Sequence, residues 1–169
     1  HPVAIVRGET CENPFYERPE IVLSDDSQTR LDWQLRQLLV QQRTRAHRKH
    51  DVLHLPAANA QHALERWYRT EARRQIQPRL DAATSALGRP HTRLAIRNQR
   101  TRWGSCSSTG AMSFNWRLML APEPVLDYVV WHEACHLVVM DHSKRFWSLL
   151  ARHRPGYRAP QRWLRANGS

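Results

Sequence analysis

The 169 residues of this chain, with a hydrophobic fraction of 41% and seven tryptophans, exclude a disordered tail and suffice for one folded domain. Three widely spaced cysteines exclude a disulfide framework and suit free thiols in a reducing compartment, so we expect a cytoplasmic protein. No apolar run approaches the ~18 residues of a membrane-spanning helix, and no signal peptide is evident at the start.

The first half of the chain is predicted to be mostly helical. In chain order we expect loop or a short strand at 1–27, an amphipathic helix at 28–46, a strand at 52–56 and a long helix from 57 to about Leu87. Gly88 and Pro90 would stop the long helix, and Pro78 is expected to kink it.

The second half begins with alternating apolar and polar residues and returns to helical spacing. We expect strands at 93–99 and 111–120 with a turn at 107–110, a buried helix from 122 to about 140, a helix capped by Ser143 and a last helix from Pro160 to Asn167. The fold class is therefore α+β in a single domain, with a small antiparallel sheet packed on the long helix and the buried helix.

The net charge of +11 suggests an acidic partner such as nucleic acid. Only Lys49 and Lys144 among the 26 basic residues are lysine, and such a bias can also come from a GC-rich genome. The strongest local cluster is RTRAHRK, 43–49, where a solvated helix end is an equally good interpretation. Because no base-reading motif is present, any nucleic-acid binding should be non-specific and fall steeply with salt.

The stretch HEACHLVVMDH, 132–142, contains His-Glu-x-x-His and a third histidine. On a helix, His132 and His136 lie on one face, so both can bind one metal ion. Glu133 would lie beside the metal, where a carboxylate can take a proton from water. The five-residue pattern alone can also arise by chance.

A hydrolytic zinc site usually has three protein ligands, so one more is needed. Downstream of His136 the available oxygen or nitrogen ligands are Asp141, His142 and His153, and no glutamate follows Glu133. His142 has the spacing found in metzincins, and would require the helix to end near Val138–Met140. Val139 replaces the metzincin glycine and no methionine follows Met140, so this is not a metzincin.

Several motifs carry a resemblance to a known family. HEACHLVVMDHSKRFW, TRWGSCSSTGAMSFNWRL, LDYVVWHE and PQRWLRANG follow one another as in the YgjP-type (WLM- and SprT-like) zinc metallopeptidase domain. The resemblance covers 57–169 and implies a zincin-like domain there, whereas 1–56 is an N-terminal extension of uncertain structure. It implies one Zn²⁺ per chain, bound by His132, His136 and His142, with Glu133 as the catalytic base.

Six further residues are candidates for substrate binding. They are Trp103, Gly104, Asn115, Arg117, His153 and Tyr157. Trp103 and Gly104 could shape an edge strand along the cleft, or simply form a tight hairpin. Asn115 and Arg117 could face the cleft, and His153 or Tyr157 could stabilise an oxyanion, but ordinary surface roles are the favoured interpretation for all four.

The resulting hypothesis is a zinc-dependent metallopeptidase that acts on proteins or peptides. The alternatives are a DNA-associated protease module, by analogy with SprT-like relatives, and a zinc hydrolase of nucleotides. The chain has no P-loop and no carboxylate cluster for magnesium, which argues against the nucleotide alternative.

Overall fold

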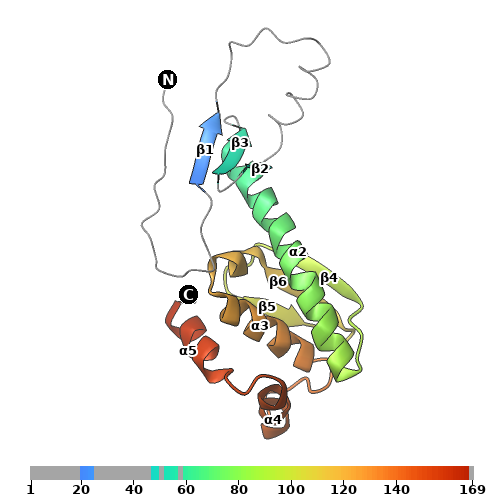
Figure 1. The fold of residues 1–169 in the computed structure, drawn as a ribbon. Coiled ribbons are helices and arrows are strands. Elements are labelled where there is room, and N and C mark those ends of the chain that lie inside the picture. The colour runs from blue at the N-terminus through green and yellow to red at the C-terminus, as the bar shows by residue number, and fades with distance from the viewer. Residues whose placement is uncertain (1–19, 25–46, 50–51, 57–58, 168–169) are drawn as a thin grey trace. The chain divides into compact units, whose positions relative to one another are not determined.

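The computed structural model describes residues 20–24, 47–49, 52–56 and 59–167 (Figure 1). The chain divides into two compact units, His1–Trp67 and Tyr68–Ser169, so each unit is described by itself. Within the described residues, no helix has both the length and the apolar character needed to cross a membrane. The helix expected at 28–46 and the basic residues 43–46 lie outside the described residues.

The first unit contains a three-stranded sheet. Its strands are β1 (Glu20–Ser24), β2 (His47–Lys49) and β3 (Val52–Pro56), in the order β1-β3-β2. The central strand β3 is the strand predicted at 52–56; it runs parallel to β1 and antiparallel to β2. Leu53 and Leu55 are buried against Ala63, the third residue of the apolar cluster in this unit.

The long helix predicted to end at Leu87 is α2 (Ala60–Leu87). Pro78 lies inside it, and the helix continues to the predicted end. Gly88 follows with φ of +64°, a left-handed conformation that glycine adopts at little cost and that commonly ends a helix.

The sheet of the second unit consists of β4 (Arg93–Arg97), β5 (Gly104–Cys106) and β6 (Ala111–Asn115), in the order β4-β6-β5. It is mixed, whereas the sequence suggested an antiparallel sheet: β6 pairs with β5 antiparallel but with β4 parallel. The chain reverses direction twice between β4 and β6, once in each intervening loop, so these two strands run the same way. The edge strand β5 pairs only with β6 in this sheet.

The strand expected at 111–120 is half that length. After β6 the chain forms a 3₁₀ helix, η2 (Trp116–Leu120). Asn115 causes the change, because its side-chain oxygen accepts a hydrogen bond from the backbone N–H of Arg117 at 3.1 Å and caps the new turn.

Three helices complete the second unit: α3 (Glu123–Cys135), α4 (Lys144–His153) and α5 (Arg158–Asn167). The predicted helix at 122–140 therefore ends earlier, at Cys135. The backbone N–H groups of His136, Leu137 and Val138 each bond to the carbonyl three residues earlier, so the last turn tightens and the chain leaves the helix axis. Ser143 occupies the N-cap position of α4 but makes no side-chain cap bond.

The core of the second unit lies between α2, α3, α4 and the sheet. Ile76 and Leu80 of α2, Phe114 of β6, Val130 of α3 and Leu150 of α4 are fully buried in one cluster. Burying each such side chain contributes roughly 1.5–3 kcal/mol. The observed fold class is therefore α+β, as predicted, and its core fixes α3 against the sheet (Figure 1).

Candidate metal centre and active site

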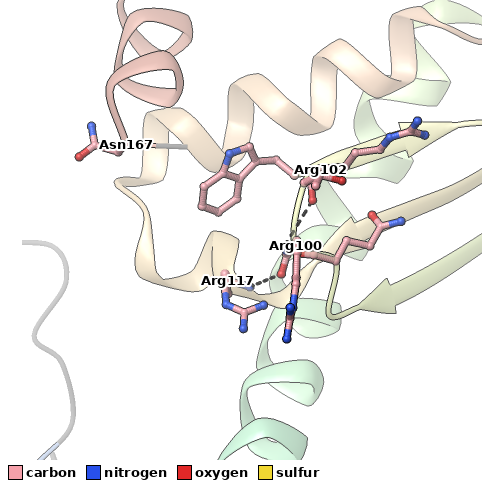
Figure 2. A pocket seen from close by; sticks show the side chains of 8 residues that line it. Arg100, Arg102, Arg117 and Asn167 are labelled. Carbon is pink, nitrogen blue, oxygen red and sulfur yellow. Dashed lines mark hydrogen bonds between the residues drawn. The ribbon is translucent and has the colours of Figure 1, made fainter. Parts of the chain in front are cut away.

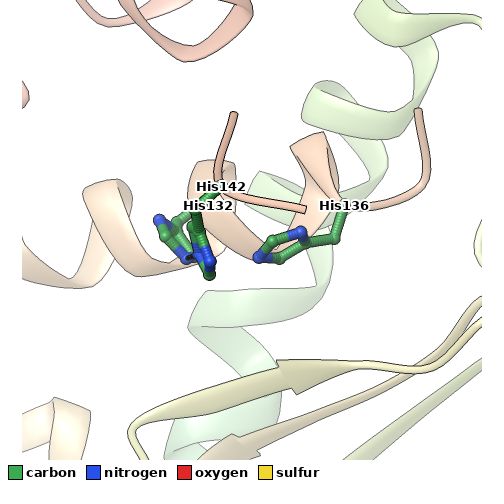
Figure 3. A group of neighbouring side chains, drawn as sticks. All are labelled: His132, His136 and His142. Atoms are coloured by element: carbon green, nitrogen blue, oxygen red, sulfur yellow. Dashed lines mark hydrogen bonds between the residues drawn. The ribbon is translucent and has the colours of Figure 1, made fainter. Parts of the chain in front are cut away.

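Three histidines from two segments converge at the end of α3. His132 lies in the last turn of α3, His136 follows the final helical residue, and His142 comes from the segment that leads to α4. One ligand nitrogen from each ring lies within 4.8 Å of the other two (Figure 3). The early end of α3 allows this, since an unbroken helix would carry His142 about 9 Å past His136.

The ring nitrogens are oriented for one shared ion. The Nε2 atoms of His132 and His142 are 3.0 Å apart, close to the spacing of about 3.3 Å expected when two imidazoles bind one tetrahedral zinc. The Nδ1 atom of His136 is 3.1 Å from the carbonyl oxygen of Val139, so it can donate there while Nε2 keeps its lone pair. The Nδ1 atom of His132 is 3.4 Å from the Tyr128 hydroxyl.

Two of the three histidines, His132 and His136, are in the protonation state that metal binding requires. Burial, followed by the neighbouring His136 and His142, lowers the pKa of His132 to about 3. Burial is also the main reason that the pKa of His136 is lowered. These two rings are therefore neutral at pH 7, and neutral imidazole is the form that binds a metal ion.

Aromatic side chains surround the three histidines. The ring centroid of Phe146, a fully buried residue of α4, lies 4.9 Å from that of His132, 4.5 Å from His136 and 4.9 Å from His142. Trp147 stacks against His142 at 5.6 Å. This apolar support holds the rings in place and lowers the local dielectric.

Glu133 follows His132 on α3 and lies against the edge of the sheet at Gly104. Its side chain is buried, at 7% exposed, and no described donor bonds to its carboxylate. Burial raises the pKa of Glu133 to about 7, while the positive charge of Arg102 acts in the opposite direction. A carboxyl group with a pKa near the working pH is suited to take up and release a proton.

Gly104, the first residue of β5, faces this carboxylate. A Cβ atom built at Gly104 would lie 2.7 Å from Cγ of Glu133 and 2.8 Å from its Oε1. Only glycine fits here without moving the Glu133 side chain. The backbone of the edge strand and the carboxylate therefore border the same space.

Comparison with known proteins identifies the family. The family model of the YgjP-like metallopeptidase domain matches residues 6–167, nearly the whole chain. The chain belongs to the YgjP-like metallopeptidase domain family. The match begins well before residue 57, where the sequence motifs first show the resemblance.

Two further comparisons, with curated proteins and with solved structures, add little to the family assignment. A search among curated proteins gives no match. Among solved structures, this YgjP-like chain is similar to the metallopeptidase zymogen of Pyrococcus abyssi abylysin, with 21% identity and a TM-score of 0.49. That similarity covers 55% of this chain and 95% of the other.

Two of the predicted substrate residues of this YgjP-like domain are Asn115, the last residue of β6, and Arg117 in the following η2. Asn115 is buried, at 4% exposed, and its side-chain N–H groups donate to the carbonyl oxygens of Gln99 and Arg102 at 2.6 and 3.3 Å. Arg117 lines a pocket of about 370 Å³ together with residues 99–103, which belong to the loop between β4 and β5 (Figure 2). Trp103, also a predicted substrate residue, lines the same pocket and packs against the core.

The last two predicted residues, His153 and Tyr157, pack against aromatic side chains of α3 and α4. His153 stacks on Trp131 with ring centroids 4.8 Å apart, and it is not one of the three converging histidines. Tyr157 stacks against Trp147 at 5.6 Å and Tyr128 at 6.5 Å, two residues that themselves contact the histidines. Tyr157 is therefore one layer removed from the three converging histidine rings.

Several residues of the site were missed by the sequence reasoning. Tyr128 precedes His132 by four residues, so helical spacing alone places it on the same face. Phe146 and Trp147 occur within a motif, but a motif does not indicate that these rings contact histidines. The charge of Arg102 acts on Glu133 because the fold brings the two residues together. In the sequence, the one indication of this is that Arg102 lies two residues before Gly104.

Proposed function

We propose that the chain is a zinc-dependent peptidase in which His132, His136 and His142 bind the ion and Glu133 is the general base. Its membership in a metallopeptidase family supports hydrolysis of peptide bonds. The single observation that carries the proposal is the convergence of three histidine rings beside a buried carboxyl group.

The donor set fits zinc. Three histidine nitrogens are a common ligand set of catalytic zinc and leave a fourth position open for water or substrate. The contacts from Val139 and Tyr128 to the two Nδ1 atoms leave Nε2 of His136 and His132 available. When bound, zinc acts as a Lewis acid on the carbonyl group and makes coordinated water more acidic.

Glu133 would handle the protons of the reaction. As the carboxylate it accepts a proton from the attacking water, and as the acid it delivers that proton to the nitrogen of the departing amine. Its raised pKa, about 7, makes both steps accessible near neutral pH. Burial also keeps bulk water away from the proton in transit.

The edge strand β5 would position the substrate. Its outer edge is unpaired in the described sheet, so an extended peptide can add to it as a further strand through backbone hydrogen bonds. Because Gly104 borders Glu133, a peptide on this edge passes the proposed base.

The two described cysteines, Cys106 and Cys135, are free thiols, which supports a cytoplasmic location.

The test is Glu133→Gln, which keeps the size of the side chain but cannot accept the proton. We expect the variant to fold and retain its zinc, measured by circular dichroism and elemental analysis. Its rate of hydrolysis of casein or unfolded protein should fall by ~10²–10⁴-fold, the loss typical of removing general acid–base catalysis. Equal turnover by the parent and the variant would show that Glu133 is not the base.

The matched control is Glu123→Gln, the same change at the first residue of α3. Glu123 forms a surface ion pair with Arg79 at 2.6 Å, and such pairs contribute less than about 1 kcal/mol. Its activity should equal that of the parent protein. A panel of nucleoside triphosphates runs alongside, and turnover of these but not of proteins would favour a nucleotide hydrolase.

A further inference from the structure

The pocket of about 370 Å³ in front of the loop between β4 and β5 is rich in arginine (Figure 2). Arg100 and Arg102 come from the loop and Arg117 from η2, and the indole of Trp103 forms part of the wall. None of the residues that line it is acidic. The pocket is therefore a concentration of positive charge with one aromatic surface.

None of these arginines forms an ion pair in the described part of the chain, and only Arg102 has an acidic group near enough for its charge to act on, Glu133. Among the described residues, the Arg117 guanidinium contacts two neutral groups, the side-chain oxygen of Asn98 and the ring of Trp116, whose centroid lies 4.7 Å from Cζ. Positive charges that share a pocket repel one another, which is electrostatically unfavourable. A bound anion would offset this repulsion through its attraction to each guanidinium group.

The loop that carries Arg100 and Arg102 is held in place by one residue. Besides its two side-chain bonds to the loop, Asn115 donates its backbone N–H to the carbonyl oxygen of Trp103 at 2.9 Å. Its side-chain oxygen meanwhile accepts from the backbone of Arg117. The two walls of the pocket are thus joined, so the backbone that carries the arginines is held in place.

The pocket also lies beside the proposed active site. Trp103 precedes Gly104, which borders Glu133, and the charge of Arg102 acts on the Glu133 carboxyl group. An extended peptide on the edge of β5 advances ~3.3 Å per residue, so a side chain a few residues from the scissile bond would reach the pocket. A peptide is favoured over a free anion because the pocket continues this edge.

We propose that the pocket binds the carboxylate of an aspartate or glutamate side chain in the substrate, with Arg100 and Arg117 as its ligands. The inference rests on the proposed peptidase function and adds a preference for acidic peptides. Arg102 lines the same pocket, and its charge also acts on Glu133. The aliphatic part of the acidic side chain packs on Trp103.

The test compares two peptides that differ only by glutamate or glutamine at the position identified by mapping cleavage sites in casein. Zinc-loaded full-length protein should cleave the glutamate peptide with kcat/KM on the order of 10-fold higher. Arg100→Gln should abolish this preference through KM, with kcat unchanged. Arg100→Lys, which keeps the charge, should restore part of it, and Arg117→Gln should repeat the effect.

Arg89→Gln is the matched control, since it removes the same charge from an exposed residue outside the pocket and should change neither peptide's kinetics.

Binding of both peptides to the zinc-loaded Glu133→Gln protein, measured by fluorescence anisotropy, gives a readout without turnover. Equal affinity for the two peptides would overturn the inference even if cleavage occurs. Tighter binding of a nucleoside triphosphate than of the acidic peptide, lost in Arg100→Gln, would overturn it in favour of a phosphate site. Absence of any peptide cleavage would count against the peptidase function separately.

Discussion

Gly104 and Glu133 are in contact across the gap between β5 and α3, such that a single added methyl group at Gly104 would overlap the glutamate side chain. The overlap is with the Cγ and carboxylate end of Glu133, so the side chain can relieve it only by rotating. The position of the proposed base therefore depends on the absence of a side chain on the neighbouring strand.

Gly104→Ala is expected to lower kcat by at least about 10-fold while the zinc content stays at that of the parent. A displacement of 1 Å at a catalytic group can cost about 100-fold in rate, which makes the expected loss measurable. Gly156→Ala is the control, because a Cβ at Gly156 meets no atom within 4 Å. Full activity of Gly104→Ala would show that Glu133 tolerates the displacement or is not the base.

Removal of His142 should release the metal, and removal of His153 should not. His142→Ala deletes one of three converging nitrogens, whereas His153→Ala deletes a ring stacked on Trp131. Zinc content after dialysis against a weak chelator measures the difference. The reverse pattern, with zinc lost only from His153→Ala, would require a different set of ligands.

Phe146→Leu should lower the zinc affinity of the folded protein, in addition to any loss in the free energy of unfolding. The change removes the surface on which all three histidine rings pack, and a smaller residue lets them move. Leu150→Ala in the same helix provides the comparison, since it is equally buried and should cost about 2–5 kcal/mol of unfolding free energy. We expect zinc affinity in the folded protein to fall for Phe146→Leu and to be retained for Leu150→Ala.

Cys106 should react slowly with thiol reagents at pH 8. Burial, with a smaller contribution from the charge of Glu133, raises its pKa to about 11, so only about one molecule in 10³ carries the reactive thiolate. A Cys11→Ser, Cys135→Ala protein isolates this thiol. Its reaction rate should rise about 100-fold on unfolding in guanidinium, and a native rate equal to the unfolded rate would contradict the prediction.

Local patterns predicted much of the proposed site. His132, Glu133 and His136 follow from helical spacing, because the distance between residues four apart is fixed by the backbone. Elimination narrowed the third ligand to three residues, and the family resemblance selected His142. The long helix and its end at Gly88 followed from the same local physics.

The parts that could not be predicted depend on contacts between distant segments. The sheet is mixed because β4 pairs with β6 and not with β5, the next strand along the chain, and no residue in β4 or β6 indicates this parallel pairing. Asn115 ends its strand because it caps a turn and holds a loop, where alternation alone suggested continuation to residue 120. The charge of Arg102 near Glu133 is likewise a product of the fold.

The third histidine lies outside the helix that carries the other two, and this has a thermodynamic consequence. In the proposed site one ion would tie the end of α3 to the segment before α4, two pieces of backbone separated by a turn. An ion that binds only the folded chain adds RT ln(1 + [ion]/Kd) to the free energy of unfolding, or about 4 kcal/mol at a 1,000-fold excess over Kd. The supply of metal would then set how long the folded enzyme survives, as well as how fast it works.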